Sequence, residues 1–354
     1  MSEWGRSALS TARLSPEPVP PRLRYWFADA LPGFEGDFTL SRIGNGQSCL
    51  TYLVRNLAWS VVLRRPPLGT HPRGAFDVGR EFRVMRALAD RAPDVPVPRV
   101  HAFCGNKSVM GAPFYVMEYI DGAVLRDVIP VGTTAGDLTT LSEQFIRSLT
   151  CIHSVSVSQA GLVDLAPQAG YLNRQLSRLQ SQWERVRRRE IRELDTLGDW
   201  LRGNVPEQLN TTLIHGDYKL DNVVVGLPEA PTIKAILDWE LSTLGDPLAD
   251  LGWLLYFWRE AGEETFAIPV CSVTDRSGFP TRLELADEYA RRTGRRLRSM
   301  SWYIALAGWK IAIIMETSYQ RYCDGITDHS TFARLDVGVP HMARRALELV
   351  SAWM

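Results

Sequence analysis

Apolar and polar residues alternate in short runs over the first third of the chain and recur at helical spacing over most of the remainder. Short β-branched and aromatic runs predict strands, whereas apolar residues three or four positions apart predict helices. Strands are expected over residues 38–43, 50–54 and 60–67, a strand that enters a turn over 113–122, and an extended connector over 95–100. Helices are expected within residues 23–31, 77–91, 137–154, 172–191, 248–258, 282–298 and 301–322.

One predicted hairpin lies near the middle of the chain. Residues 223–225 and 233–237 are apolar runs on either side of a Gly/Pro cluster at 226–231, a pattern typical of two paired strands. Asp217 and Asn222 precede the first strand, and Asp238 follows the second. A single hairpin can therefore direct two carboxylates and one amide into one cleft. This arrangement suits phosphoryl transfer, which needs a base near the attacking hydroxyl and oxygen ligands for Mg²⁺.

The spacing of these residues matches the catalytic loop of protein kinases, H-R-D-x-x-x-x-N. His215, Gly216 and Asp217 are followed at the same interval by Asn222, with glycine in place of the arginine. Asp238 stands where the metal-binding Asp of D-F-G would stand, but Trp and Glu follow it. The alternative interpretation is a polar turn and hairpin with carboxylates on the surface.

With Gly245-Asp246-Pro247 and Asp250 close behind, the stretch resembles the aminoglycoside phosphotransferase family. The resemblance implies an α+β fold of the two-lobed protein-kinase-like type: a small antiparallel β-sheet N-lobe and a mostly helical C-lobe, with ATP between them. It divides the chain into a tail with a short helix (1–35), an ATP-binding N-lobe (36–118) and a C-lobe with catalytic loop and acceptor site (119–354). It also implies that Asp250 holds the catalytic-loop backbone.

The same resemblance implies roles for residues of the N-lobe. Gly44, Gly46 and Ser48 lie in a glycine turn between two predicted strands, where backbone N–H groups can approach phosphate oxygens. Arg64 occupies the register of the kinase lysine that binds phosphates, and Glu81 on the following helix is its expected partner. An exposed Glu in an arginine-rich helix is the alternative interpretation of Glu81. The run Val62-Leu63-Arg64 followed by prolines resembles the branch whose members are fused to acyl-CoA dehydrogenases. A solvated edge strand is the competing interpretation of the arginine.

The remaining predicted site residues follow kinase order. The backbone from Glu118 to Ile120 corresponds to the hinge that holds adenine. Asp217 is expected to orient or deprotonate the acceptor hydroxyl, while Asn222 and Asp238 are expected to bind Mg²⁺.

Composition narrows the classes of partner. Lys+Arg 40 balance Asp+Glu 40, so a nucleic-acid binder, which usually carries a basic excess, is not expected. The longest apolar stretch, residues 302–315, contains Lys310 and is too short to span a bilayer, so no membrane association is expected. The five cysteines are scattered without C-x-x-C, a pattern that favours a cytoplasmic location.

The acceptor stays open at this point. An aminoglycoside carries many ammonium groups and favours an acidic pocket, yet the acids of residues 282–298 are mixed with arginines. A hydroxylated acyl compound, including one carried on coenzyme A, suits the aromatic and basic residues at least as well. The run Arg185–Arg189 is either a solvated face or, less simply, a patch for an anionic substrate.

Two other functions are compatible with parts of the pattern. A catalytically inactive nucleotide-binding module ranks second, because Asp217, Asn222 and Asp238 are all present. A protein kinase ranks third, because D-F-G and A-P-E are absent from the sequence.

Overall fold

The N-terminal part of the protein is built on one antiparallel sheet. The computed structural model describes residues 16–43, 49–69, 76–227, 231–266, 273–327 and 330–353. The sheet has the strand order β1-β2-β3-β4-β6-β5, and its neighbouring strands are all antiparallel. Its strands are β1 (Pro16–Glu17), β2 (Thr39–Ile43), β3 (Leu50–Arg55), β4 (Ser60–Arg65), β5 (Val100–Cys104) and β6 (Phe114–Glu118).

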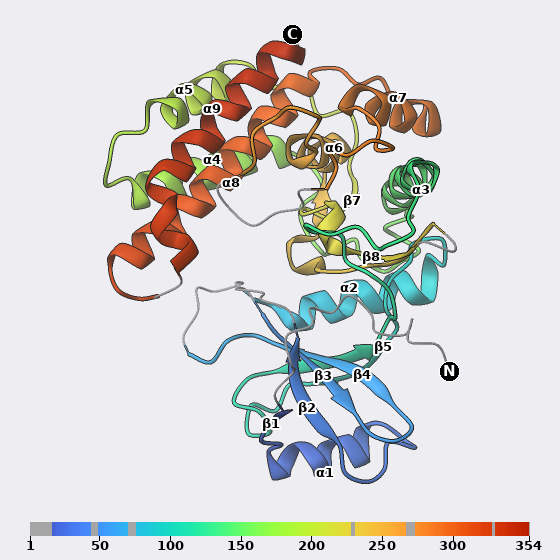
Figure 1. Cartoon of the computed structure of the whole chain (residues 1–354). Coiled ribbons are helices and arrows are strands. Elements are labelled where there is room, and N and C mark those ends of the chain that lie inside the picture. Colours follow the sequence, from blue (N-terminus) through green and yellow to red (C-terminus); the bar gives the residue numbers. More distant parts are fainter. Residues whose placement is uncertain are drawn as a thin grey trace.

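Two helices pack on this sheet (Figure 1). Helix α1 (Pro21–Ala30) contributes Leu23 and Phe27 to a buried cluster with alternate residues of β3, β4 and β6, among them Val54, Leu63 and Phe114. Helix α2 (Val78–Arg91) contacts β5 and β6, and its buried residues belong to the cluster that continues into the helical lobe. The sheet therefore has a separate small core on the α1 side and shares the main core on the α2 side.

The second lobe is mostly helical (Figure 1). Its helices are α3 (Ala135–His153), α4 (Tyr171–Val186), α5 (Arg192–Gly203), α6 (Pro247–Phe257), α7 (Arg282–Thr293), α8 (Met300–Cys323) and α9 (Leu335–Trp353). Helix α8 is the centre of the lobe, in contact with α4, α5, α6 and α9. Among the residues that the structure describes, no helix has both the length and the apolar character that a membrane span requires.

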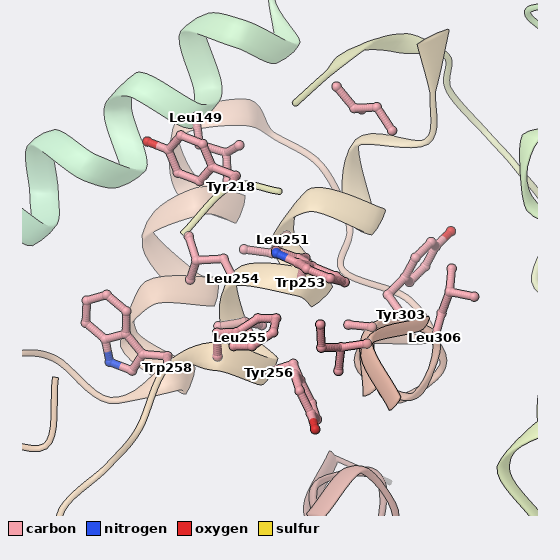
Figure 2. Close-up of a cluster of buried hydrophobic side chains, with 14 of the residues drawn as sticks. Leu149, Tyr218, Leu251, Trp253, Leu254, Leu255, Tyr256, Trp258, Tyr303 and Leu306 are labelled. Atoms are coloured by element: carbon pink, nitrogen blue, oxygen red, sulfur yellow. The ribbon is translucent and has the colours of Figure 1, made fainter. Parts of the chain in front are cut away.

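Helix α6 is buried on all sides, which explains its near-continuous apolar sequence. Figure 2 shows Leu251, Leu254 and Leu255 of this helix, with Tyr218 of the catalytic loop on one side and Tyr303 of α8 on another. Gly252 permits the close approach of the two helices, because a Cβ atom there would lie 2.6 Å from the backbone of Tyr303. Helices α6 and α8 therefore form a rigid support behind the catalytic loop.

Short strands carry the loops between the lobes. Strands β8 (Val223–Gly226) and β9 (Thr232–Ile236) form the predicted hairpin, with Val223 opposite Ile236. Strands β7 (Thr212–Ile214) and β10 (Thr243–Gly245) also pair with each other. Among the described residues, the 3₁₀ turns are η2 (Leu220–Asn222), η3 (Trp239–Leu241) and η4 (Ser330–Arg334).

The observed architecture confirms the expected fold class, but two predicted helix ends were wrong and one strand of the sheet was missed. The helix expected over 172–191 ends at Val186, and α5 is a separate helix. The helix expected to reach residue 298 ends at Thr293, because Gly294 adopts φ +65° and terminates it. The extended connector over 95–100 leads into a strand, β5, that the sequence pattern did not predict.

Candidate active site

The catalytic loop begins where β7 ends, at His215 and Gly216. Gly216 has φ +84°, and a Cβ atom there would lie 2.5 Å from the carbonyl oxygen of Leu241, so only glycine fits this turn. Asp250 of α6 accepts hydrogen bonds from the N–H groups of His215 (2.6 Å) and Gly216 (2.8 Å). The role expected of Asp250 is thus matched by direct contacts with the loop backbone.

The buried neighbours of Asp250 stabilise its ionised form. Burial would raise the pKa of this carboxyl, but the hydrogen bond and charge of His153, the charge of His215 and the Gly216 N–H outweigh burial and leave the pKa below its ordinary value. Nε2 of His153 lies 3.3 Å from the carboxylate. His153, which ends α3, therefore helps to anchor the loop from a third helix.

Asp217 lies among three side-chain donors. Its carboxylate accepts from Nε1 of Trp253 (2.8 Å), Nδ2 of Asn222 (2.7 Å) and Nζ of Lys219 (3.0 Å). Burial would raise the pKa of Asp217, but Lys219, His215 and Lys310 lower it below its ordinary value. Because Lys219 Nζ lies 3.0 Å from both carboxylate oxygens, these donors fix the position of both oxygens of Asp217.

The hairpin brings the two predicted metal ligands to the same place. The N–H of Leu237 donates to the carbonyl of Asn222 (2.8 Å), so Asn222, just before β8, and Asp238, just after β9, lie at the same end of the hairpin. Asp238 adopts the left-handed conformation with φ 65°, which Asp tolerates better than most residues.

The side chains of Asn222 and Asp238 are suited to bind a magnesium ion that also binds the phosphates of the substrate. Asn222 uses its Nδ2 for Asp217, so its Oδ1 is the atom that can ligate a metal. Within the described ranges, no group of three or more His, Cys, Asp or Glu side chains could hold a metal ion. Two protein oxygens suit Mg²⁺, which usually keeps waters and phosphate oxygens in its coordination shell.

Arg64 faces this hairpin from the N-lobe. Its Nε lies 3.1 Å from Glu81 and its Nη2 lies 2.5 Å from Asp238 and 3.6 Å from Glu240. Glu81 is 1% exposed, and burial raises its pKa although Arg64 opposes this effect. The expected ion pair between Arg64 and Glu81 is present, and the solvated-edge interpretation of Arg64 was wrong.

The rest of the expected nucleotide site is only partly described. Gly44, Gly46 and Ser48 lie outside the described residues. Glu118 ends β6, and its N–H already donates to the carbonyl of Arg99 (2.8 Å). In the part of the chain that the structure covers, the Ile120 backbone makes no hydrogen bond. Its N–H and C=O therefore stay free for the predicted contact with adenine.

Three residues near Asp217 were not predicted to belong to the site: Lys219, Trp253 and Lys310. Lys310 donates to the carbonyl of Gly216 (2.8 Å), and its Nζ lies 4.2 Å from the ring centre of Trp253. The sequence pattern explained Trp253 and Lys310 as parts of apolar helices. Lys310 could have been identified as a candidate site residue, because it is a lysine within an otherwise apolar stretch.

Three arginines of the run 185–189 are held in ion pairs. Arg187 pairs with Asp195, Arg188 with Asp324, and Arg189 with Glu316. The first two pairs are partly exposed, in agreement with a solvated face. Arg189 instead holds Glu316, whose side chain is 0% exposed, so it ties the segment before α5 to α8.

Comparison with known proteins gives consistent matches. The family model described as "Phosphotransferase enzyme family" matches residues 39–285. An acyl-CoA dehydrogenase family member 11 of Rattus norvegicus is 34% identical over 308 residues, which are 83% of this chain but 38% of the relative. The chain thus spans well under half the length of that relative. This match supports the resemblance to the branch fused to acyl-CoA dehydrogenases.

Two solved structures extend the comparison to the fold. A putative aminoglycoside phosphotransferase from Ralstonia eutropha is 30% identical, with a TM-score of 0.78 and coverage of 94% of this chain and 98% of that chain. An aminoglycoside phosphotransferase in ternary complex with ADP and hygromycin B has a TM-score of 0.57 at 16% identity, covering 91% of this chain and 97% of that chain. The second likeness shows the fold alone, and that fold is the two-lobed kinase-like one.

Proposed function

Because the chain belongs to the phosphotransferase enzyme family, we propose that it transfers the γ-phosphate of ATP to a hydroxyl group of a small molecule, with Mg²⁺. The observation that carries the proposal is the convergence of Asp217, Asn222 and Asp238 on one hairpin opposite Arg64. The related fold that binds ADP supports a nucleotide as co-substrate.

Each residue has a definite task in this reaction. The acceptor oxygen forms a bond to the γ-phosphorus, the bond from that phosphorus to the bridging oxygen breaks, and ADP leaves. Asp217 orients the hydroxyl and receives its proton as the new bond forms. Arg64 binds phosphate oxygens, with Glu81 holding the guanidinium in place. Asn222 and Asp238 hold Mg²⁺, which neutralises phosphate charge when bound.

The low pKa of Asp217 indicates how the site works. A carboxylate that stays ionised is a weak base, so its main contribution is to orient the hydroxyl and to favour the positive charge that develops on it. This agrees with a loose transition state, in which positioning and charge neutralisation contribute more than base strength.

The charges around Asp217 favour one acceptor class. Two ammonium groups, those of Lys219 and Lys310, lie beside this carboxylate, and Lys219 also lies 5.7 Å from the ring centre of Phe257. These ammonium groups offset the negative charge of the carboxylates around them, which weakens the attraction for a polycationic aminoglycoside. A hydroxylated acyl compound, including one carried on coenzyme A, offers negative charge and apolar surface to these groups. We therefore propose it before an aminoglycoside-like acceptor, and we propose a cytoplasmic location on the cysteine pattern.

The test is an ADP-release screen over hydroxylated metabolites, hydroxyacyl-CoA compounds and aminoglycosides, with Mg²⁺ and ATP. Asp217→Asn serves as the inactive control, and Asp127→Asn, at an exposed position, serves as the matched active control. Acceptor-dependent ADP release by the wild type and Asp127→Asn alone supports the proposal. Nucleotide binding without release for any acceptor would favour the inactive nucleotide-binding module.

A further inference from the structure

We propose that Lys310 of α8 is a positioning residue for Asp217, which acts through the indole of Trp253 and the carbonyl of Gly216. Its effect on rate rests on the proposed phosphoryl transfer, whereas its effect on the Trp253–Asp217 contact does not.

The contacts form a continuous chain from α8 to the carboxylate. The ammonium of Lys310 lies 4.2 Å from the ring centre of Trp253, and the indole N–H of Trp253 donates to Oδ1 of Asp217 at 2.8 Å. A cation over the face of an indole draws electron density from the ring. The indole N–H then becomes a stronger donor to the carboxylate, as neighbouring interactions of this kind reinforce one another.

Lys310 also fixes the backbone of the catalytic turn. Gly216 donates its N–H to Asp250 (2.8 Å) and accepts at its carbonyl from Lys310 (2.8 Å). The residue before Asp217 is thus held at both polar backbone atoms, by α6 on one side and α8 on the other. Because α6 and α8 approach closely at Gly252, they can hold Asp250 and Lys310 in fixed positions relative to Gly216.

The charge of Lys310 is sensitive to its surroundings. Burial lowers its pKa to about 8, with Arg178 of α4 and Lys219 acting in the same direction, while Asp217 and Asp250 oppose them. Tyr171 of α4 and Tyr303 of α8 line the same small cavity. The ammonium is therefore present at neutral pH and lost in mildly alkaline solution.

The choice of residue is unusual for this chain. It has four lysines among its 40 cationic side chains, and two of them, Lys219 and Lys310, lie at the Asp217 loop. A compact ammonium fits between an indole face and a carbonyl, whereas a planar guanidinium has a different shape and stays charged at all relevant pH values.

The first test reads the Trp253 indole and needs no acceptor. In protein with ¹⁵N-labelled tryptophan, the Trp253 N–H signal is identified by its loss in Trp253→Phe. We expect it to move upfield as the pH rises through the pKa of Lys310, and to stay upfield at every pH in Lys310→Met. The Trp302 indole, which donates to the carbonyl of Leu201, is the control signal and should not move with the pKa of Lys310. Lys107→Met, at an exposed position, is the control variant and should leave the titration of Trp253 unchanged. A Trp253 signal that is the same in wild type and Lys310→Met at all pH values would overturn the proposal.

The second test measures turnover with an acceptor from the screen. Lys310→Met should lower kcat by about 10- to 100-fold through misplacement of Asp217, with little change in the KM for ATP. Wild-type kcat should fall as the pH rises through the pKa of Lys310, and both Lys310→Met and Lys310→Arg, which do not titrate in this range, should lack this fall. A structural role alone would change stability without removing the alkaline fall.

The two tests separate the two proposals. Absence of turnover in the wild type with every acceptor would overturn the proposed function, while the indole titration would still decide the role of Lys310. If Lys310→Met does not fold, the titration of wild-type Trp253 against that of Lys310→Arg decides it, since only the wild-type signal should move near the pKa of Lys310.

Discussion

The guanidinium of Arg64 lies 2.5 Å from a carboxylate oxygen of Asp238, although the two side chains are expected to bind opposite partners, phosphate and metal. The charge of Arg64 is therefore shared between Asp238 and Glu81 in this structure. Binding of Mg²⁺ with a nucleotide has to exchange this contact for two new ones: Asp238 with the metal and Arg64 with phosphate oxygens. Nucleotide affinity and metal affinity should consequently be coupled.

Replacing Asp238 by Asn should abolish Mg²⁺-dependent turnover and preserve the fold. Asn tolerates the left-handed backbone at this position, and its loss of charge removes the stronger of the two predicted metal ligands. Turnover measured against Mg²⁺ concentration checks this, with Asp127→Asn as the control. Wild-type activity that persists in excess chelator would contradict the assignment.

Replacing Arg64 by Ala should weaken ATP binding by roughly 10- to 100-fold, because a hydrogen bond to a charged group contributes about 1.5–3 kcal/mol. The change also leaves Glu81 buried without its partner, which should cost about 3–5 kcal/mol of stability. Arg64→Ala combined with Glu81→Gln should recover part of that stability but none of the affinity. Calorimetric titration with ATP and urea unfolding measure the two effects, and unchanged affinity in folded Arg64→Ala would remove Arg64 from the nucleotide site.

Replacing Asp217 by Asn should lower kcat by about 10²- to 10⁴-fold and leave ATP affinity nearly unchanged. Asn preserves the shape of the side chain and removes its charge. Nucleotide titration together with single-turnover phosphate transfer measures both properties. Transfer at the wild-type rate by Asp217→Asn would show that the role given to Asp217 is wrong.

Replacing Arg189 by Met should destabilise the protein far more than replacing its neighbour Arg188. Arg189 is the cation that compensates Glu316, which is 0% exposed, so its loss should cost about 3–5 kcal/mol. Arg188 pairs with Asp324 at the surface, and such a pair contributes about 0–1 kcal/mol. Urea unfolding of the two variants measures the difference. Equal stabilities would show that Arg189, like Arg188, belongs to a solvated face.

The stability of the protein should decline in acid partly through Glu263. Burial raises the pKa of this carboxyl, but hydrogen bonds from Arg282 and Arg345 outweigh burial and lower the pKa from 4.5 to about 2. Between these values the unfolded chain binds more protons than the folded protein, so this contribution is complete above pH 4.5 and is lost as the pH falls toward 2. Glu263→Gln should flatten the pH dependence of unfolding in this window, and an unchanged slope would refute the assignment.

The parts of the site that the sequence predicted are those encoded locally. The interval from Asp217 to Asn222 and the flanking strands lie within one hairpin, so spacing alone predicts their proximity. Arg64 and Glu81 were paired through the resemblance, and the structure shows the contact. Lys310 is 93 residues beyond Asp217 in the chain, and only the packing of α8 against α6 brings it to the loop.

The error at the end of α4 has a similar cause. The segment after Val186 has no Gly or Pro to mark the helix end, so local pattern extended the helix to residue 191. Beyond the end of the helix, Arg189 binds Glu316 of α8 and the carbonyl of Leu335. These partners are distant in sequence, and a local pattern contains no information about them.

Helix α1 also bears on how much of the chain is needed for independent folding. The family match begins at residue 39, but the small core on the outer face of the sheet includes Leu23 and Phe27. A chain cut at residue 39 would bare Val54, Leu63 and Phe114 on one sheet face. A continuous apolar surface of this kind promotes self-association in solution. The cooperative unit therefore extends beyond the family segment, and a truncated protein lacking α1 should aggregate even with every catalytic residue in place.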